Sequence, residues 1–159
     1  MPEGYAIQAI QSVLNSQQAY CKFLSANDSG ATGGHQSGIL ISKSAKNMMF
    51  SQDLKGENIL KRTVEIRWQD NSCTQSSFTY YSSKNELRIT RFGRNFSFLN
   101  PEQTGALFVF TKQDVDQYSG FFLETEEDIN QFLDAFGISP TETNRLIDAG
   151  QVQEETQER

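Results

Sequence analysis

The sequence predicts a mainly β fold: a barrel or strongly curved sheet of about seven short strands with flanking α-helices. Three observations support this prediction. Apolar and alternating stretches are short and separated by polar turns, as expected for short strands. Helical spacing of apolar residues occurs near the two ends of the chain and in one short central segment. Twelve Phe, five Tyr and one Trp supply large side chains for a core.

The first half of the chain predicts a helix followed by strands and one short helix. Residues 5–19 place apolar side chains at helical spacing over about four turns, which predicts an amphipathic helix. The apolar run 39–41 is expected to form a strand, and residues 44–50 are expected to form a short helix. Residues 63–68 alternate between apolar and charged side chains, which is typical of a half-buried strand.

The second half predicts a hairpin, two more strands and a closing helix. Residues 77–82 and 86–90 flank a short polar turn and are expected to pair as a hairpin. Residues 106–111 and 120–124 are expected to form two further strands. Thr125 and the three acidic residues after it are typical of a helix N-terminus, and the next glycine is expected to end that helix.

The length of 159 residues suits a single domain with a substantial core. Residues 1–150 are expected to form this domain, and residues 151–159, which have no apolar face, a disordered tail or the start of a linker. No apolar run approaches the roughly 20 residues of a membrane helix, and the N-terminus lacks the pattern of a signal peptide. Cys21 and Cys73 are therefore expected to stay reduced in the cytoplasm.

The charge of the chain is unevenly distributed along the sequence. The net charge is −6, yet residues 1–111 hold 11 Lys and Arg against 8 Asp and Glu. Residues 112–159 hold 3 Lys and Arg against 12 Asp and Glu. A local basic surface is therefore compatible with the acidic total, but non-specific binding to nucleic acid is expected to be weak.

A polar, glycine-punctuated segment at residues 24–36 reads LSANDSGATGGHQ. Its hydroxyl, amide, carboxylate and imidazole groups can donate and accept hydrogen bonds, which is the capacity needed to read base edges. Such clusters often form only turns, but about a dozen residues exceeds the usual length of a connection. A phosphate-binding P-loop is excluded because the GxxxxGK[ST] pattern and a following helix start are missing.

A second polar segment, residues 88–95, reads RITRFGRN and carries three arginines at a spacing of three. The fork of an arginine can bind a guanine edge or a phosphate through two hydrogen bonds. If residues 88–90 are extended, Arg88 and Thr90 share one strand face and Arg91 begins the turn. A solvated, charged strand face would explain the same residues, and composition alone leaves both interpretations open.

The chain also contains the residue types of a catalytic or metal site. His35 is the single histidine, and with Cys21 and Cys73 it could form a cysteine hydrolase site or part of a zinc site. Two thiols and one imidazole fall short of a four-ligand structural zinc site, and no Cys-x-x-Cys spacing occurs. The scattered carboxylates show no metal-nuclease pattern, so both alternatives are disfavoured.

Three sequence blocks resemble one known family. LSANDSGATGGHQSG at residues 24–38, LRITRFGRN at 87–95 and NPEQTGAL at 100–107 are similar to the N-terminal effector domain of EcoRII-type (type II) restriction endonucleases. The resemblance covers roughly residues 20–125. It implies a B3-like DNA-binding pseudobarrel whose two arms clamp the major groove. The N-terminal arm falls on residues 22–36 and the C-terminal arm on residues 88–95.

The resemblance also implies partners and site residues. It implies recognition of a double-stranded 5′-CCWGG-like site and a nuclease domain in the same polypeptide, within a bacterial cytoplasmic restriction-modification enzyme. This domain is expected to be monomeric, non-catalytic and without cofactor or membrane partner, and Mg²⁺ is expected only for the nuclease domain. The expected DNA-binding residues are Lys22, Ser25, Asn27, Asp28, Ser29, Thr32, His35, Gln36, Arg88, Arg91, Phe92, Arg94 and Asn95.

Side-chain chemistry assigns different roles within this set. Arg91 and Arg94 suit guanines or phosphates, and Asp28 can accept a hydrogen bond from a cytosine amino group. Hydroxyl groups of the first segment are better suited to phosphates. Two other classes stay open: an enzyme in its own right, and a barrel that binds protein or carbohydrate through the same loops.

Overall fold

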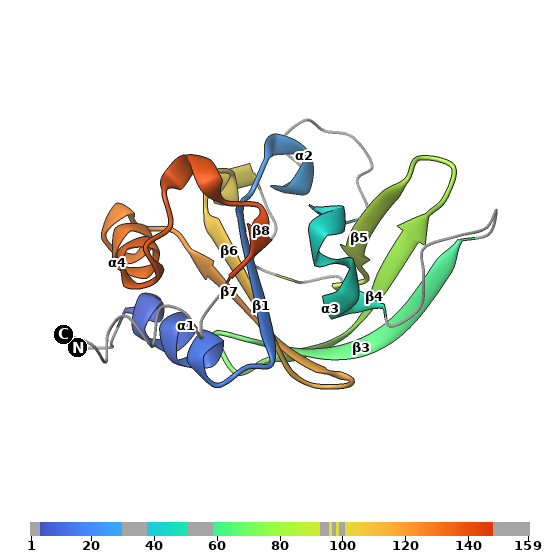
Figure 1. Cartoon of the computed structure of the whole chain (residues 1–159), viewed down its shortest axis with the longest axis horizontal. Coiled ribbons are helices and arrows are strands. Elements are labelled where there is room, and N and C mark those ends of the chain that lie inside the picture. The colour runs from blue at the N-terminus through green and yellow to red at the C-terminus, as the bar shows by residue number, and fades with distance from the viewer. Residues whose placement is uncertain are drawn as a thin grey trace.

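The computed structural model describes residues 4–29, 38–50, 59–92, 96, 98 and 101–147. Within these residues one eight-stranded sheet has the order β2-β5-β4-β3-β7-β6-β1-β8 and curls into a half-barrel (Figure 1). Neighbouring strands are antiparallel except for β3 and β7, which are parallel. The predicted mainly β fold with flanking helices is therefore confirmed.

The first helix is shorter than predicted because a strand begins inside the expected helix. Helix α1 (Tyr5–Leu14) ends at Asn15, and β1 (Gln18–Phe23) follows it. Strand β1 is buried on both faces: Cys21 packs under α1, and Tyr20 points into the half-barrel. A strand buried on both faces lacks polar–apolar alternation, so the sequence pattern did not separate it from the helix.

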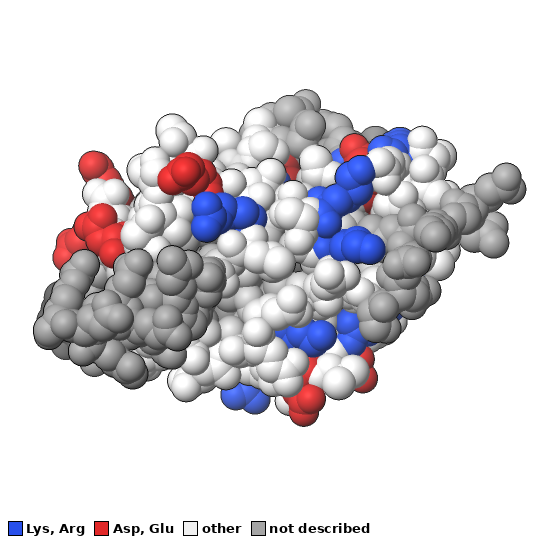
Figure 2. Space-filling model, viewed as in Figure 1, with Lys and Arg blue, Asp and Glu red and all other residues white. Residues whose placement is uncertain are grey.

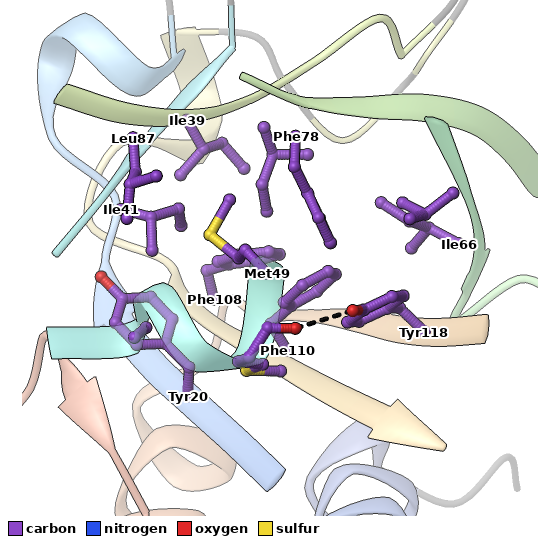
Figure 3. Close-up of a cluster of buried hydrophobic side chains, with 14 of the residues drawn as sticks. Tyr20, Ile39, Ile41, Met49, Ile66, Phe78, Leu87, Phe108, Phe110 and Tyr118 are labelled. Carbon is purple, nitrogen blue, oxygen red and sulfur yellow. Dashed lines mark hydrogen bonds between the residues drawn. The ribbon is translucent and has the colours of Figure 1, made fainter. Parts of the chain in front are cut away.

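The short helix predicted at residues 44–50 is present and packs against the barrel interior. Strand β2 (Ile39–Ile41) leads into η1 (Lys43–Ala45) and α3 (Lys46–Met49). Met49 lies among the buried aliphatic and aromatic side chains of the half-barrel (Figure 3). The Tyr118 hydroxyl donates a hydrogen bond of 2.7 Å to the carbonyl oxygen of Met48, which ties the helix to the sheet.

Three antiparallel strands form the sheet next to β2. They are β3 (Leu60–Trp68), β4 (Cys73–Tyr81) and β5 (Glu86–Thr90). Strand β3 buries its last three apolar residues and exposes the charged residues between them, as the alternation predicts. Strands β4 and β5 form the predicted hairpin, and Asn85 adopts a positive φ of 55° in its turn.

The C-terminal elements also confirm the predictions. They are β6 (Leu107–Asp114), β7 (Gln117–Leu123) and α4 (Glu126–Phe136), which the Thr125 hydroxyl caps by accepting from the Asp128 N–H at 3.1 Å. Four short elements complete the described chain: α2 (Ala26–Ser29), η2 (Pro101–Gln103), η3 (Pro140–Glu142) and the unpredicted edge strand β8 (Arg145–Leu146).

Two clusters of buried side chains lie on opposite faces of the curled sheet. The larger one fills the half-barrel and includes Phe108 and Phe122, whose ring centroids are 5.1 Å apart. The smaller one lies under α1 and α4, which pack side by side (Figure 1). Among the described helices, none is long and apolar enough to cross a membrane.

Candidate nucleic-acid interface

The described residues at both ends of the first polar segment contact strands that flank the second polar segment. The first leaves β1 at Leu24, where the Leu24 N–H donates to the Ala106 carbonyl oxygen at 2.9 Å, eleven residues beyond the end of the second segment. The first segment returns through β2, which pairs with β5 so that Ile39 lies opposite Ile89, at the start of the second segment. The return of the first segment therefore lies beside the start of the second, and its departure lies beside the strand that follows the second.

Gly38 makes the closest of these contacts. Its φ of 93° is rarely adopted by other residues, and a Cβ atom here would lie 1.7 Å from the Ile89 carbonyl oxygen. The same Cβ would lie 3.1 Å from the ring of Phe92. Glycine at this position therefore allows the base of the first segment to pack directly on the base of the second.

A buried ion pair fixes the base of the first segment. The Lys22 Nζ atom lies 2.7 Å from Asp28 Oδ2, and the two side chains are 10% and 1% exposed. Both residues also bind the backbone of β2: Lys22 donates to the Leu40 carbonyl oxygen at 2.7 Å, and Asp28 Oδ1 accepts from the Leu40 N–H at 3.0 Å. Strand β1, helix α2 and strand β2 are thereby joined at one point.

Ser25 and Asp28 form a reciprocal cap at the start of α2. The Ser25 N–H donates to Asp28 Oδ2 at 3.0 Å, and the Asp28 N–H donates to Ser25 Oγ at 3.2 Å. This exchange satisfies backbone donors that the helix start would leave unpaired. Both carboxylate oxygens of Asp28 are thus engaged within the protein, so its expected contact with cytosine is not available in this conformation.

The described arginines of the second segment differ in exposure. The Arg88 side chain is 13% exposed, and its Nη2 atom lies 3.4 Å from Glu86 Oε1. Arg91 is exposed and has a positive φ of 64°, and its carbonyl oxygen accepts from the Ser76 hydroxyl at 3.0 Å. Strand β5 therefore ends before Arg91, where the backbone becomes left-handed, and Gly93 of the predicted turn lies outside the described residues.

An aromatic cluster anchors the second segment to the barrel. The Phe92 ring lies 5.8 Å from Trp68 and 5.0 Å from Phe96, and the Phe98 ring stacks on Phe122 at 5.4 Å. Phe92 was expected to bind DNA, and it is partly buried here. Three Phe residues in an otherwise polar stretch, Phe92, Phe96 and Phe98, are the sequence signal for this anchor.

Several expected contact residues lie outside the described residues: Thr32, His35, Gln36, Arg94 and Asn95. The backbone of Asn27 and Ser29 belongs to α2, but their side chains are also outside this description. Figure 2 shows acidic side chains gathered around α4 and basic side chains over α3 and β5. The uneven charge of the sequence is therefore also uneven in space.

The catalytic alternatives involve Cys21, Cys73 and His35, and His35 lies outside the described residues. In the described parts of the chain, no three His, Cys, Asp or Glu side chains are grouped as a metal site would require. Cys21 is fully buried, and this burial raises the pKa of its thiol to about 12. Since the thiolate is the reactive form, Cys21 has the character of a structural cysteine.

The curled sheet with helical plugs is the architecture of a B3 domain. A similar fold occurs in the crystal structure of the B3 domain of the UbaLAI restriction endonuclease with cognate DNA, with a TM-score of 0.57. The match covers 90% of this chain and 94% of that chain at 19% sequence identity, so it is a likeness of fold.

Sequence comparison identifies the family. The family model for the N-terminal region of restriction endonuclease EcoRII matches residues 13–142, and the chain belongs to this family. The type II restriction enzyme EcoRII of Escherichia coli is 35% identical over 99 residues, in a match that covers 55% of this chain. The match covers 24% of that enzyme, so the chain spans about a quarter of its length.

Proposed function

We propose that this chain is a sequence-specific effector domain that binds double-stranded DNA for a type II restriction endonuclease. Its two polar segments act as arms that enter the major groove of a 5′-CCWGG-like site. The observation that carries this proposal is the pairing of Ile39 with Ile89, which joins the return of the N-terminal arm to the start of the C-terminal arm. Family membership and the shared B3 fold support it.

The arms carry the chemistry that such a site requires. In the major groove guanine presents two acceptors, and cytosine presents an amino donor. The exposed Arg91 and, further along the C-terminal arm, Arg94 suit guanine edges or phosphates. Base edges also suit the amide and imidazole groups of Asn27, His35, Gln36 and Asn95, whereas phosphates suit the hydroxyl groups of Ser25, Ser29 and Thr32.

Three of the expected contact residues hold the arms in this proposal. Lys22 and Asp28 pin the N-terminal arm through their buried ion pair, and Phe92 seats the C-terminal arm on Trp68. A preformed arm loses less conformational entropy when the duplex binds, so these residues contribute to affinity without contacting a base. The acidic total charge lowers non-specific binding, which leaves recognition to the arms.

The domain is non-catalytic in this proposal. Cleavage belongs to a nuclease domain of the same polypeptide with Mg²⁺, and binding of the site by this domain positions or releases that nuclease. The buried thiol of Cys21 supports this division of labour.

A competition gel-shift tests the proposal. We expect a CCWGG duplex to be retained in preference to a shuffled duplex, and Arg94→Ala to cost about 1–3 kcal/mol and to relax the preference at one base pair. Lys84→Gln, which removes a charge from the β4–β5 turn, serves as the control. Equal retention of both duplexes would contradict the proposal.

Two further measurements address the alternatives. Specific cutting of a plasmid by this chain with magnesium would favour a stand-alone enzyme. If no duplex is retained even at low salt, a barrel that binds another class of ligand is favoured.

A further inference from the structure

The outer face of strands β3, β4 and β5, opposite the barrel interior, contains a polar hollow of about 330 Å³. Its floor consists of three hydroxyl-bearing residues that are at most 7% exposed. Two exposed cations, Lys61 and Arg91, lie at its edges. The lining residues are Lys61, Ser77, Thr79, Tyr81, Thr90 and Arg91.

The strand register aligns two cations with one hydroxyl. Thr79 lies opposite Lys61 on β3 and opposite Arg88 on β5. Residues that pair directly across a sheet share one face, and neighbouring strands are about 4.8 Å apart. Lys61 and Arg88 therefore flank Thr79 with Cα atoms roughly 10 Å apart. Ser77 and Thr90 form the next pair along the same face.

Several donors on this face have weak partners or none. Arg88 Nη1 is buried and has no hydrogen-bond partner among the described residues. The hydroxyls of Thr79 and Thr90 are 3.4 Å apart, as are those of Ser77 and Thr79, which is the long limit for such bonds. Arg88 does not line the hollow, so the donors that an occupant with acceptor oxygens would meet there are these weakly paired hydroxyls.

We propose that this hollow binds a phosphate group of the DNA backbone, outside the groove that the arms enter. Two cations and three hydroxyl donors suit the several oxygens of a phosphate. Arg91 belongs to both the hollow and the first turn of the C-terminal arm, so a duplex held by the arms passes close to the hollow. This proximity favours a backbone phosphate over a free one. The inference rests on the proposed function.

Two carboxylates share this strand face. Glu86 lies beside Arg88 and opposite Tyr81, and it offsets the charge of Arg88. Glu65 lies further along β3, two positions beyond Thr63. Neither lines the hollow, so Lys61 and Arg91 leave it with a positive charge.

The test compares matched variants by fluorescence anisotropy at several salt concentrations, with a CCWGG duplex and a shuffled duplex. Lys61→Gln is expected to weaken binding to both duplexes several-fold and by the same factor, because a phosphate contact carries no sequence information. It is also expected to reduce the slope of log affinity against log salt by about one. Thr79→Val should shift affinity in the same direction, and Lys61→Arg should restore it.

Lys84→Gln is the control, because it removes the same charge from the turn between β4 and β5 without lining the hollow. If Lys61→Gln behaves like Lys84→Gln while the unmodified chain binds the CCWGG duplex, the inference is wrong and the proposed function stands. Inorganic phosphate is the second probe. If phosphate raises the melting temperature of the unmodified chain but Lys61→Gln leaves the affinity for DNA unchanged, the site takes free phosphate and the DNA assignment is overturned. A chain that binds no duplex contradicts both proposals.

Discussion

At the residue scale, the base of the N-terminal arm depends on a charged pair that is almost fully buried. Lys22 and Asp28 are withdrawn from water, and each also binds the backbone of Leu40. Removing one member of such a pair leaves an uncompensated charge, which is more destabilising than losing an exposed ion pair. The loss of either charge is therefore expected to disturb the base of the arm.

We expect Asp28→Asn to lower the free energy of unfolding by about 3–5 kcal/mol, because Lys22 would remain buried without a charged partner. Urea denaturation measures this loss. Glu86→Gln is the matched control: its pair with Arg88 is 3.4 Å long and more exposed, so the expected cost is below about 1 kcal/mol. The double variant Lys22→Met with Asp28→Asn should recover much of the loss. Equal costs for the two single variants would refute this role.

A second residue-scale prediction concerns Gly38. Gly38→Ala should lower the free energy of unfolding more than Gly105→Ala does, with a difference of about 1–3 kcal/mol. Both glycines have a similar φ, 93° and 91°, so the backbone strain is matched. A Cβ at Gly38 would meet the Ile89 carbonyl oxygen, whereas a Cβ at Gly105 would meet no atom within 4 Å. Equal melting temperatures of the two variants would show that the close contact does not matter.

At the element scale, the helices of this fold are short and depend on caps and on the sheet. Helix α4 has 11 residues, and a helix of this length is marginal alone in water. Three of its four acidic residues lie in the first turn, where the helix dipole stabilises them, and Gly137 ends it in the left-handed conformation. The N-cap Thr125 is the side chain that fixes where the helix begins.

Thr125→Ala should therefore cost about 1 kcal/mol of stability, because the Asp128 N–H loses its acceptor. Thr125→Ser keeps the hydroxyl and should cost much less. Thermal unfolding followed by circular dichroism measures both. The same melting temperature for Thr125→Ala and the unmodified chain would mean that the cap is redundant.

At the scale of the whole molecule, the two cores bury several titratable groups in neutral form. Burial raises the pKa of Cys21 from 9.0 to about 12, and it raises the pKa values of Tyr20 and Tyr118 above 10.0. Tyr118 lies on β7 in the middle of the sheet, and Tyr20 and Cys21 lie on β1, which is covered by the edge strand β8. Their protonation state is therefore linked to the stability of the entire domain.

This linkage predicts a loss of stability at alkaline pH. The unfolded chain releases these protons at about pH 9–10, whereas the folded chain keeps them, so stability is complete below about pH 9 and falls as the pH rises. Each group contributes a slope of about 1.4 kcal/mol per pH unit. Urea unfolding between about pH 7 and 11 measures it. Cys21→Val should reduce the slope and Cys73→Ser, at an exposed site, should not. A flat profile would contradict the linkage.

The sequence predicted most elements, because their patterns are local. The alternation in β3, the hairpin turn before Asn85 and the cap at Thr125 depend on neighbours along the chain. Strand β1 was missed because both of its faces are buried, and β8 because two residues carry no period. Among the site residues, the exposure of Arg91 just after β5 was predictable from the residues around Gly93.

The sequence by itself determined the curled β fold, the polar character of the two arms and the family of the chain, because periodicity, composition and motif are all properties of the chain. The tertiary structure decided that Lys22 and Asp28 point inward, that Phe92 is an anchor and that Lys61 and Arg88 flank Thr79. The physical reason is that strand pairing brings together residues distant in sequence. Whether a charge faces water or a partner depends on those neighbours.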